Sequence, residues 1–598
     1  MKKIPFDSAA GAVILFDKGS CDMDSRAQII FKRHVRIKFI NKASINRWAN
    51  RTISVVRAHE SLEKLKGAAY NLEDGVITES KMNDNAVFET KLDRRVDQIK
   101  FTIPNVKEGS VIEFSYTIRR SQSLLPSWTF QYDIPSLYSE YEVDNPSRFT
   151  FLTELRGFQL LSGHSEKIRG SVQKWVMKNI PGFKEEPFTA NSEDYISRMD
   201  FHLTEIALPG RPLINLTITW PQITKGLWEQ IDFGGVVKTS GYLKSTVSEI
   251  TEGKSDEQKI TAVYDFVKSN VAWNKLVDII PDRPFKKVLE EKKGSSSEIN
   301  LMMVSMLQKA GLTSLPVLLS TRKHGSVNRF HPSFNEFNDV ICMVKLGEKK
   351  FLLDATDRGL PMNALPERCL NGEGLIVSPD SAKWVPLVSI RSRKVVNADY
   401  QVTDKGQLVG KITIKRDGLE ASDMRKSYKD KGSEKYVKES YAGHWELSNS
   451  TFENVENANQ PAAESHDMQI NDHTQIAGDV IYLNPYVIDR MEENIFKSVD
   501  RKYPVDFGTP VDRIYQSKIQ IPDAFVVEDL PKQKLIMLPN SGGKFVYTTL
   551  LIGNTITFVS QFIINRSVFT ADEYAVLREF YNQVVAKQAE QIVLRKKS

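Results

Sequence analysis

Residues 292–312, KKGSSSEINLMMVSMLQKAGL, constrain the fold of this chain more than any other stretch of its sequence. Ser295 followed three positions later by Glu298 is a capping box, which marks the start of a helix. Gly311 is the residue type that most often ends one. Between these signals, six apolar residues fall on one helical face: Ile299, Met302, Met303, Met306, Leu307 and Ala310. The sequence therefore predicts a helix with one face buried against a core.

We expect this helix to belong to a compact α+β unit. Ahead of it, SDEQKITAVYDFVKSNVAW begins with the capping candidates Ser255 and Asp256 and keeps its apolar residues at helical spacing. After it come three strand-like runs, SLPVLLS, DVICMVKL and FLLDATD. Helices followed by a run of strands are typical of an α+β domain, which we place at residues 241–380.

The sequence before this unit is predicted to be mostly β. VRIKFI and SVIEFSYTIRR alternate between polar and apolar residues, and NLEDGVITES is expected to form a hairpin that turns at Asp74-Gly75. The opening MKKIPFDSAAGAVILFD has no small-residue cleavage site after its short apolar run, so it is interpreted as a first strand and not as a signal peptide.

After the unit, the β pattern returns in KGQLVGKITIK. Residues 425–475 are polar and are expected to form helix and loop, and the segment from TADEYAVLREF onward is predicted as an amphipathic helix. The final LRKKS is expected to be a solvated basic tail.

The prediction is thus a multidomain α+β protein. A chain of 598 residues exceeds the size at which one hydrophobic core stops growing. We expect a β-sandwich-like domain at residues 1–240, the α+β core at 241–380, and a β-rich domain with a terminal helix at 381–598.

Charge and cysteine content exclude some classes of protein. The 81 Lys and Arg against 75 Asp and Glu leave a net charge of +6, too dilute for a nucleic-acid-binding protein. No apolar run reaches the length of about 18 residues that a membrane span needs. The three cysteines lack CxxC spacing, so the sequence leaves open one disulfide with a free thiol, or three reduced thiols.

The central sequence resembles the transglutaminase-like superfamily, whose papain-like core carries Gly-x-Cys at a helix start, then a His on a strand, then an Asp after the next strand. The matching stretches here, in the same order, are Gly294-Ser295-Ser296, FNDVI and LDATD. Further echoes are FTIPNVKEGSVIEFSYTI and PSWTFQYDIPSLYSEY before the core, and DRKYPVDFGTP and IPDAFVVEDLP after it. Within the superfamily the chain resembles bacterial proteins with an N-terminal domain of unknown function (family 3857) and a matching C-terminal β-rich domain.

The resemblance places the nucleophile position at Ser296, the base position at Asp339 and the orienting acid at Asp354. Of these, only Asp354 has the residue type that the superfamily uses, because its mechanism needs a cysteine thiolate beside an imidazole. The resemblance therefore implies a pseudoenzyme with a transglutaminase-like or cysteine-protease-like fold, whose cleft binds a peptide, a protein or a glycan. Its relatives are typically exported, so we expect the periplasm or cell surface, with the leader peptide absent from this sequence.

Two alternatives stay open. In the first, Ser296 is active as a hydrolase or acyl transferase, with Asp339 made more basic by repulsion from Asp354 across the hairpin at Gly347-Glu348. His331, in the loop before Asp339, is then the candidate substitute base. In the second, the chain is a structural assembly protein of the cell envelope.

The sequence indicates neither a cofactor nor a metal, because it has no Gly-rich phosphate loop and no recognised ligand spacing. Cys342 is expected in the core on the strand face opposite Asp339. Trp128 and Trp273 are candidate ligand contacts, with core positions as the alternative. The oligomeric state is left open.

Overall fold

The computed structural model describes residues 4–23, 28–92, 96–121, 124–145, 148–166, 172–208, 210–441 and 445–597. The chain splits into two compact units, each described by itself below. Unit 1 comprises Met1–Glu185 and Ser192–Thr217, and unit 2 comprises Glu186–Asn191 and Ile218–Ser598.

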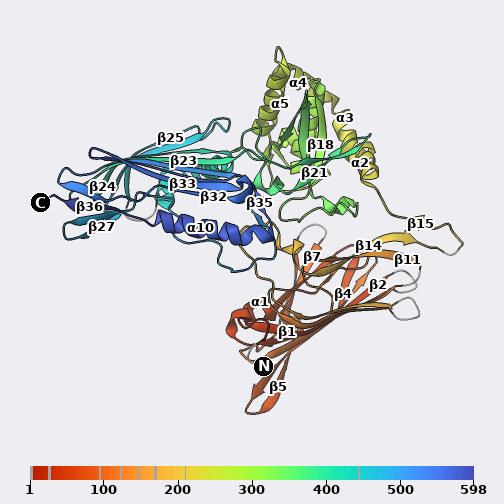
Figure 1. Ribbon diagram of the computed structural model, residues 1–598. Helices are drawn as coiled ribbons and strands as arrows, with labels where there is room; N and C mark the ends of the chain where they lie inside the picture. Colours follow the sequence, from red (N-terminus) through yellow and green to blue (C-terminus); the bar gives the residue numbers. More distant parts are fainter. Residues whose placement is uncertain are drawn as a thin grey trace. The chain divides into compact units, whose positions relative to one another are not determined.

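Unit 1 is built from strands around one hydrophobic core (Figure 1). Its described residues include one short helix, α1 (Ile45–Ala49). Its strands are β1 (Ala12–Met23), β2 (Ile29–Phe39), β3 (Asn50–Val56), β4 (Glu60–Glu73), β5 (Val76–Lys81), β6 (Val87–Lys91), β7 (Val96–Thr102), β8 (Val111–Arg120), β9 (Trp128–Thr129), β10 (Ser136–Asp144), β11 (Phe149–Arg156), β12 (Gly163–Glu166), β13 (Val172–Ile180), β14 (Arg198–Ile206) and β15 (Ile214–Asn215).

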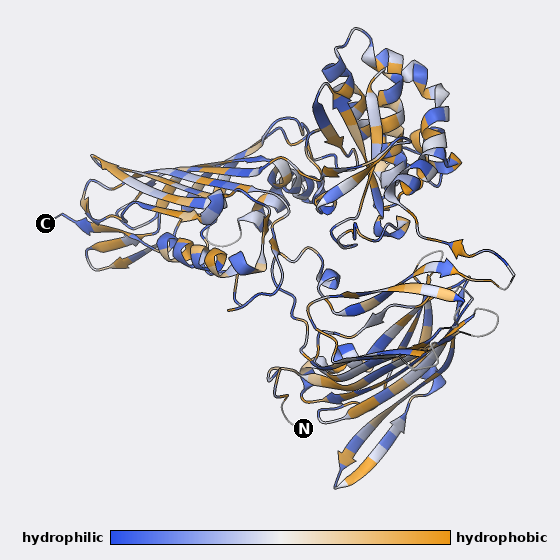
Figure 2. Cartoon of the chain, turned by 45° about the vertical axis from the view of Figure 1, so that its right-hand side comes forward, coloured by the Kyte–Doolittle hydropathy of each residue, from blue (hydrophilic) through white to orange (hydrophobic). Residues whose placement is uncertain are grey.

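An eight-stranded sheet in the order β12-β13-β10-β1-β2-β8-β4-β5 is the largest element of unit 1. Two smaller sheets, β3-β7-β6 and β11-β14-β15 with β9, contribute side chains to the same core. Hydrophobic and hydrophilic residues alternate along the long strands, as expected when one sheet face is solvated (Figure 2). The predicted hairpin is present, and Asp74 and Gly75 take the positive φ angles of +51° and +82° that its turn needs.

The first part of unit 2 packs helices on a five-stranded sheet in the order β20-β19-β18-β21-β22. Its helices are α2 (Trp220–Glu229), α3 (Val236–Thr239), α4 (Lys244–Thr251), α5 (Asp256–Asn270), α6 (Phe285–Glu291) and α7 (Ser296–Lys309). Its strands are β16 (Ala272–Trp273), β17 (Lys293–Gly294), β18 (Thr313–Leu319), β19 (Asp339–Leu346), β20 (Lys349–Leu353), β21 (Glu373–Val377) and β22 (Ala382–Pro386).

Helix α7 is buried on all sides and not on one face only, since every residue from Ser296 to Leu307 is buried. It packs against β18 and β19, and α3, α4 and α5 pack against it in turn. A helix in this position needs apolar or internally paired residues around its whole circumference. This differs from the amphipathic helix that the six apolar positions predicted.

The second part of unit 2 has an eight-stranded sheet, β25-β26-β24-β23-β30-β34-β33-β32, and a four-stranded sheet, β27-β28-β36-β31. Its helices are α8 (Gly418–Lys431), α9 (Ser433–Ser440) and α10 (Tyr574–Gln588). Its strands are β23 (Ser392–Val402), β24 (Leu408–Asp417), β25 (Trp445–Glu453), β26 (Ala462–Ile470), β27 (Thr474–Ala477), β28 (Val480–Leu483), β29 (Val505–Asp506), β30 (Val511–Gln520), β31 (Phe525–Asp529), β32 (Lys534–Leu538), β33 (Gly543–Ile552), β34 (Thr555–Ile564), β35 (Val568–Phe569) and β36 (Ile592–Lys596).

Two expectations for this part were wrong. The polar stretch 425–475 holds β25 and β26 besides helix and loop. The LRKKS tail is not wholly solvated, because Leu594 to Lys596 belong to β36, which pairs with both β28 and β31. In both cases the pairing with distant strands overrides a polar local composition.

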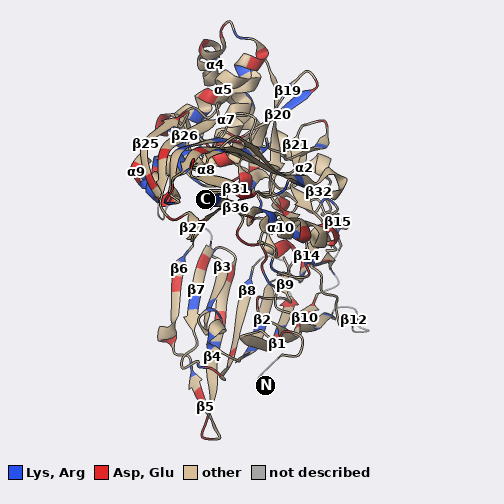
Figure 3. Cartoon of the chain, turned by 60° about the vertical axis from the view of Figure 1, so that its left-hand side comes forward, with Lys and Arg blue, Asp and Glu red and all other residues tan. Residues whose placement is uncertain are grey.

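The structure is thus multidomain and strand-rich, as predicted, while the limits 1–240, 241–380 and 381–598 stay a prediction. None of the helices in the described part of the chain has the length and apolar character that crossing a membrane requires. Figure 3 shows acidic and basic residues interspersed along the strands and helices.

Candidate functional site

The predicted nucleophile position lies at the start of α7, where local sequence fixes the helix end. The Ser295 hydroxyl accepts from the backbone N–H of Glu298 at 3.3 Å, and the Glu298 carboxylate accepts from the N–H of Ser295 at 2.8 Å. Arg283 donates to the buried Glu298 carboxylate at 2.9 and 2.6 Å. The predicted capping box is confirmed, and an arginine that the sequence did not single out neutralises its acid.

Ser296 is fully buried, and its polar atoms are bonded within the protein. Its backbone N–H donates to the Leu276 carbonyl at 3.1 Å. Its hydroxyl oxygen accepts from the N–H of Asp278 at 3.1 Å and lies 3.4 Å from the Asp278 carbonyl. The hydroxyl also lies close enough to the carboxyl of Asp339 to lower the pKa of that carboxyl. Residues 276–278 therefore cover the atoms that a nucleophilic serine would present to a substrate.

The two predicted acids meet beside Ser296. Asp339 begins β19 and Asp354 follows the last residue of β20, and the two strands are joined at Gly347-Glu348 as predicted. Both side chains are fully buried. The structure therefore brings Ser296, Asp339 and Asp354 together.

Arg368, which the sequence analysis missed, lies between the two acids. Its Nε is 3.2 Å from Asp339 Oδ2 and its Nη2 is 2.6 Å from Asp354 Oδ2. The ring of Trp273 stacks on the guanidinium, with 4.6 Å between the guanidinium carbon and the ring centroid. A buried pair of carboxylates requires a cation. The sequence signal that could have identified Arg368 is therefore the need for a cation near two buried acids, which Arg358 and Arg368, the next two arginines after Asp354, could meet.

Burial dominates the electrostatics of the site. Desolvation raises the pKa of Asp339 to about 6 against the charge of Arg368, and the charge of Asp354 contributes to the rise. The sequence predicts this rise from repulsion by Asp354 alone, whereas burial is its main cause. Burial by itself disfavours the charged guanidinium, yet the charges of Asp354 and Asp339 hold the pKa of Arg368 above its ordinary value.

Hydrogen bonds to neighbouring elements hold the acids in place. Asp354 Oδ1 accepts from the N–H of Thr356 at 2.8 Å. Asn300, one turn along α7 from Ser296, donates to the Val340 carbonyl at 3.0 Å and accepts from the N–H of Ala355 at 3.1 Å. Both strand ends are thus tied to the same helix.

His331 lies in the loop ahead of β19 and is half-buried. Its neighbour His324 is exposed, and its Nδ1 is 2.8 Å from the Ser320 hydroxyl oxygen. The role of His331 as a substitute base stays a prediction.

The site also brings together potential metal ligands. Ligand atoms of Asp339, Asp354 and Cys369 lie within 4.8 Å of one another. However, the guanidinium of Arg368 already pairs with both carboxylates, and burial raises the pKa of the Cys369 thiol well above its ordinary value. These residues do not fit a metal, since a metal needs a thiolate and free carboxylate oxygens.

The other cysteines and the candidate tryptophans have core positions or support the site. Cys21, Cys342 and Cys369 are all free and buried, and Cys342 packs in the core that includes α7, as predicted. Trp128 is a buried core residue of unit 1. Trp273 is half-buried and covers Arg368.

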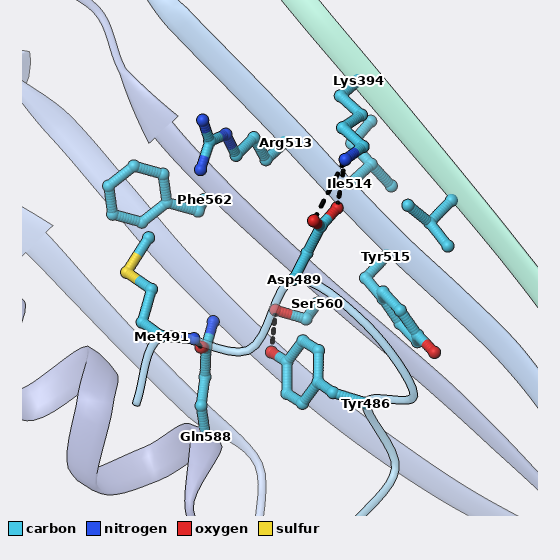
Figure 4. Close-up of a pocket in the computed structure, with 11 residues that line it drawn as sticks. Lys394, Tyr486, Asp489, Met491, Arg513, Ile514, Tyr515, Ser560, Phe562 and Gln588 are labelled. Atoms are coloured by element: carbon cyan, nitrogen blue, oxygen red, sulfur yellow. Dashed lines mark hydrogen bonds and ion pairs between the residues drawn. The ribbon is translucent and has the colours of Figure 1, made fainter. Parts of the chain in front are cut away.

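A small cavity in the second part of unit 2 is lined by apolar side chains and by polar groups, of which two pairs are bonded to each other (Figure 4). Its volume is about 30 Å³. The Lys394 ammonium lies 2.7 Å from the Asp489 carboxylate, and the Tyr486 hydroxyl donates to that of Ser560 at 2.5 Å. A space of this size holds little more than a water molecule, so it is not a ligand site.

Two family profiles match parts of the chain. DUF3857, a domain of unknown function with a solved structure, matches residues 27–184. DUF3858, with the same description, matches residues 479–594. No curated protein matches the chain. The domains of unknown function expected before and after the core are therefore present, and neither match includes Ser296, Asp339 or Asp354.

Among the solved structures that the chain resembles, the first of three matches nearly its whole length. A candidate protease from Parabacteroides distasonis is 12% identical with a TM-score of 0.59, and the match covers 98% of this chain and 99% of that one. A candidate cysteine protease from Cytophaga hutchinsonii is 8% identical over 56% of this chain and 85% of that one, with a TM-score of 0.18. An M1 zinc metallopeptidase from Deinococcus radiodurans is 7% identical over 47% and 63%, also with a TM-score of 0.18. The first likeness shows a shared fold, and the other two carry no argument.

Proposed function

We propose that the transglutaminase-like site of this chain is catalytically inactive and acts by binding, and that Arg368 holds its former catalytic positions in an inactive arrangement. The observation that carries the proposal is the double ion pair of Arg368 with Asp339 and Asp354, at 3.2 and 2.6 Å. A papain-like mechanism needs a mobile proton carrier beside the nucleophile. A guanidinium cannot accept a proton from a serine, because it stays charged at any physiological pH.

The surroundings of Ser296 support the same conclusion. Its backbone N–H, which would have to face a developing oxyanion, donates to the Leu276 carbonyl. Its side chain is fully buried, so a substrate carbonyl has no access to it in this conformation. Turnover would require residues 276–278 to move and Arg368 to release Asp339.

One observation favours the second candidate, an active hydrolase or acyl transferase that uses Ser296. The Ser296 hydroxyl lies near Asp339, whose pKa is raised by burial to about 6, closer to neutral pH than that of an ordinary aspartate. The ion pair to Arg368 opposes this role, because it stabilises the carboxylate and lowers its affinity for a proton.

The proposed ligand surface is the one directly above the former nucleophile position. Leu276 is 61% exposed and Trp273 is half-buried, so an apolar side chain and an aromatic ring face solvent next to Arg368. Such a surface suits a peptide, a protein segment or a glycan, which bind to aromatic and apolar side chains. We place this role in the periplasm or at the cell surface on the family resemblance.

The test measures labelling, turnover and binding on the full-length chain. We expect an alkyl fluorophosphonate to leave Ser296 unmodified, and Ser296→Ala to change neither amide hydrolysis nor transamidation of peptide substrates. Arrays of peptides and glycans should yield ligands that Leu276→Asp weakens about tenfold or more, which corresponds to the loss of one buried apolar contact.

Phe330→Asp is the matched control, because Phe330 is a 90% exposed apolar residue elsewhere in unit 2. An adduct on Ser296, or turnover that disappears in Ser296→Ala, would contradict the inactive assignment. Equal loss of binding in Leu276→Asp and Phe330→Asp would contradict the proposed ligand surface.

A further inference from the structure

A second serine in unit 2 is hydrogen-bonded to a histidine that in turn contacts a glutamate. Ser450 lies on β25, and His466 and Glu464 lie on the neighbouring strand β26. The Ser450 hydroxyl oxygen is 2.7 Å from His466 Nδ1, and His466 Nε2 is 3.3 Å from Glu464 Oε2. All three residues lie outside the DUF3857 and DUF3858 matches. This is the order of groups that activates a serine nucleophile.

The backbone presents Ser450 at the surface while its partner stays in the interior. The pairing of β25 with β26 shifts register between Ser448 and Thr451, which marks a β-bulge. Asn449 within the bulge has a φ of +48°, and Ser450 after it is exposed. His466 is fully buried behind it. A bulge next to an active site commonly re-aims a side chain in this way.

The environment of Glu464 fixes the proton positions along the three residues. Burial alone would raise the pKa of Glu464, but hydrogen bonds with His466 and Tyr441 and the charge of Arg416 lower it to about 2. Arg416, Tyr436 and Tyr441 all donate to Oε1, which leaves Oε2 for His466. Because Glu464 is then an ionised acceptor, a neutral His466 donates through Nε2–H and accepts from the Ser450 hydroxyl at Nδ1.

Ser450 opens onto a groove of about 850 Å³ between α8, α9 and β25. The other residues that line it are mostly aromatic or apolar: Tyr428, Val437, Tyr441, Trp445, Leu447 and Phe452, with Ser433, Glu434 and Lys438. The Phe452 ring lies 4.8 Å from that of Tyr428 and 5.8 Å from that of His466. A concave groove that offers aromatic and apolar side chains beside a few polar groups is the usual form of a small-molecule site.

We propose that Ser450 is the nucleophile of an acyl-transfer site that hydrolyses esters of aromatic or medium-length alkyl acids. The Ser450 oxygen forms a bond to the ester carbonyl carbon as His466 Nδ1 takes the hydroxyl proton. His466 gives that proton to the alcohol oxygen as the ester C–O bond breaks, leaving an acyl-serine. Water then attacks the acyl-serine with His466 as base, which releases the carboxylic acid and restores Ser450.

Glu464 is a positioning residue in this scheme, because it holds the ring and stabilises the imidazolium without touching the substrate. The groups that face His466 are Ser450 and Glu464 by hydrogen bond, and the rings of Tyr441 and Phe452. Arg416 and Tyr436 act on it through Glu464.

The experiment uses the full-length chain, an alkyl fluorophosphonate and p-nitrophenyl butyrate. We expect a fluorophosphonate adduct on Ser450, located by tandem mass spectrometry, and ester hydrolysis that falls at least about 100-fold in Ser450→Ala. Ser448→Ala is the matched control, because Ser448 is an exposed serine on the same strand, and it should keep full activity. Since Ser450 is exposed, its replacement by alanine should leave the circular dichroism spectrum unchanged.

Glu464→Gln tests the positioning role. We expect kcat to fall about tenfold or more with little change in KM, because the ring is no longer held for proton transfer. An unmodified Ser450, or hydrolysis that survives in Ser450→Ala, would overturn the proposal. The same digest shows whether the fluorophosphonate modifies Ser296 and whether it modifies Ser450. The two results are therefore separate, and failure of the Ser450 proposal is distinct from failure of the proposed function.

Discussion

At the scale of single residues, Arg368 decides the chemistry of the central site. Asp339 and Asp354 are fully buried, and two uncompensated carboxylates in such a place would destabilise the fold. Arg368 compensates both, and Trp273 covers its guanidinium. The positive charge of the site is therefore supplied by a group that cannot exchange its proton.

Asp339 gives a prediction about pH. Its pKa is raised from 3.8 to about 6 in the folded chain, so between these values the folded state binds more protons than the unfolded state. This group therefore contributes stability that is fully present below pH about 4 and is lost as the pH rises to about 6. Asp339→Asn should remove that contribution, and the free energy of unfolding in urea should then fall less between pH 4 and pH 6. Identical pH profiles for the two chains would contradict the raised pKa.

At the scale of elements, the sequence predicts those that depend on local signals and misses those that depend on pairing with distant strands. The starts of α5 and α7 follow directly from the capping boxes at Ser255 and Ser295. The strands β25 and β26 could not be read from their polar sequence, because their stability comes from pairing with each other and with β24. The same applies to β36, which was expected as a solvated tail.

The strand β36 provides the prediction at this scale. Ile592 and Leu594 are fully buried, and the strand pairs on both sides. Removing residues 592–598 should lower the free energy of unfolding by at least the ~2–5 kcal/mol that one buried Leu or Ile side chain contributes. Removing residues 597–598 alone is the control and should cost far less, which urea unfolding measures. Equal stability of the two truncated chains would show that β36 is dispensable.

At the scale of the whole molecule, the chain divides into two units with separate hydrophobic cores. Unit 1 has its own core of strand residues, and the cores around α7 and α10 both belong to unit 2. Units whose cores share no residues can unfold separately, so two-state behaviour is not expected for the full chain.

Calorimetry of the full chain should therefore resolve at least two transitions. Ile37→Ala leaves a cavity in the core of unit 1. This should lower the free energy of unfolding by about 2–5 kcal/mol and shift one transition. Arg368→Met leaves two buried carboxylates unpaired in unit 2. This should lower the free energy of unfolding by about 3–5 kcal/mol and shift the other transition. A single transition that both variants move together would contradict the independence of the units.

The sequence by itself determined the features that depend on neighbours in the chain. These are the capped helix that begins at Ser296, the hairpin at Asp74-Gly75, the hairpin that brings Asp339 to Asp354, and the predominance of strands on both sides of the core. Capping, turn geometry and periodicity act over a few residues, so they can be predicted from the sequence alone.

Only the tertiary structure decided which groups complete each site. The partners of Asp339 and Asp354 include Arg368, the cover of Ser296 comes from residues 276–278, and His466 meets Ser450 across a strand pair. Each of these contacts joins residues at least 14 positions apart. Their selection depends on burial, because a charge or hydroxyl taken out of water binds whichever partner the fold brings within reach.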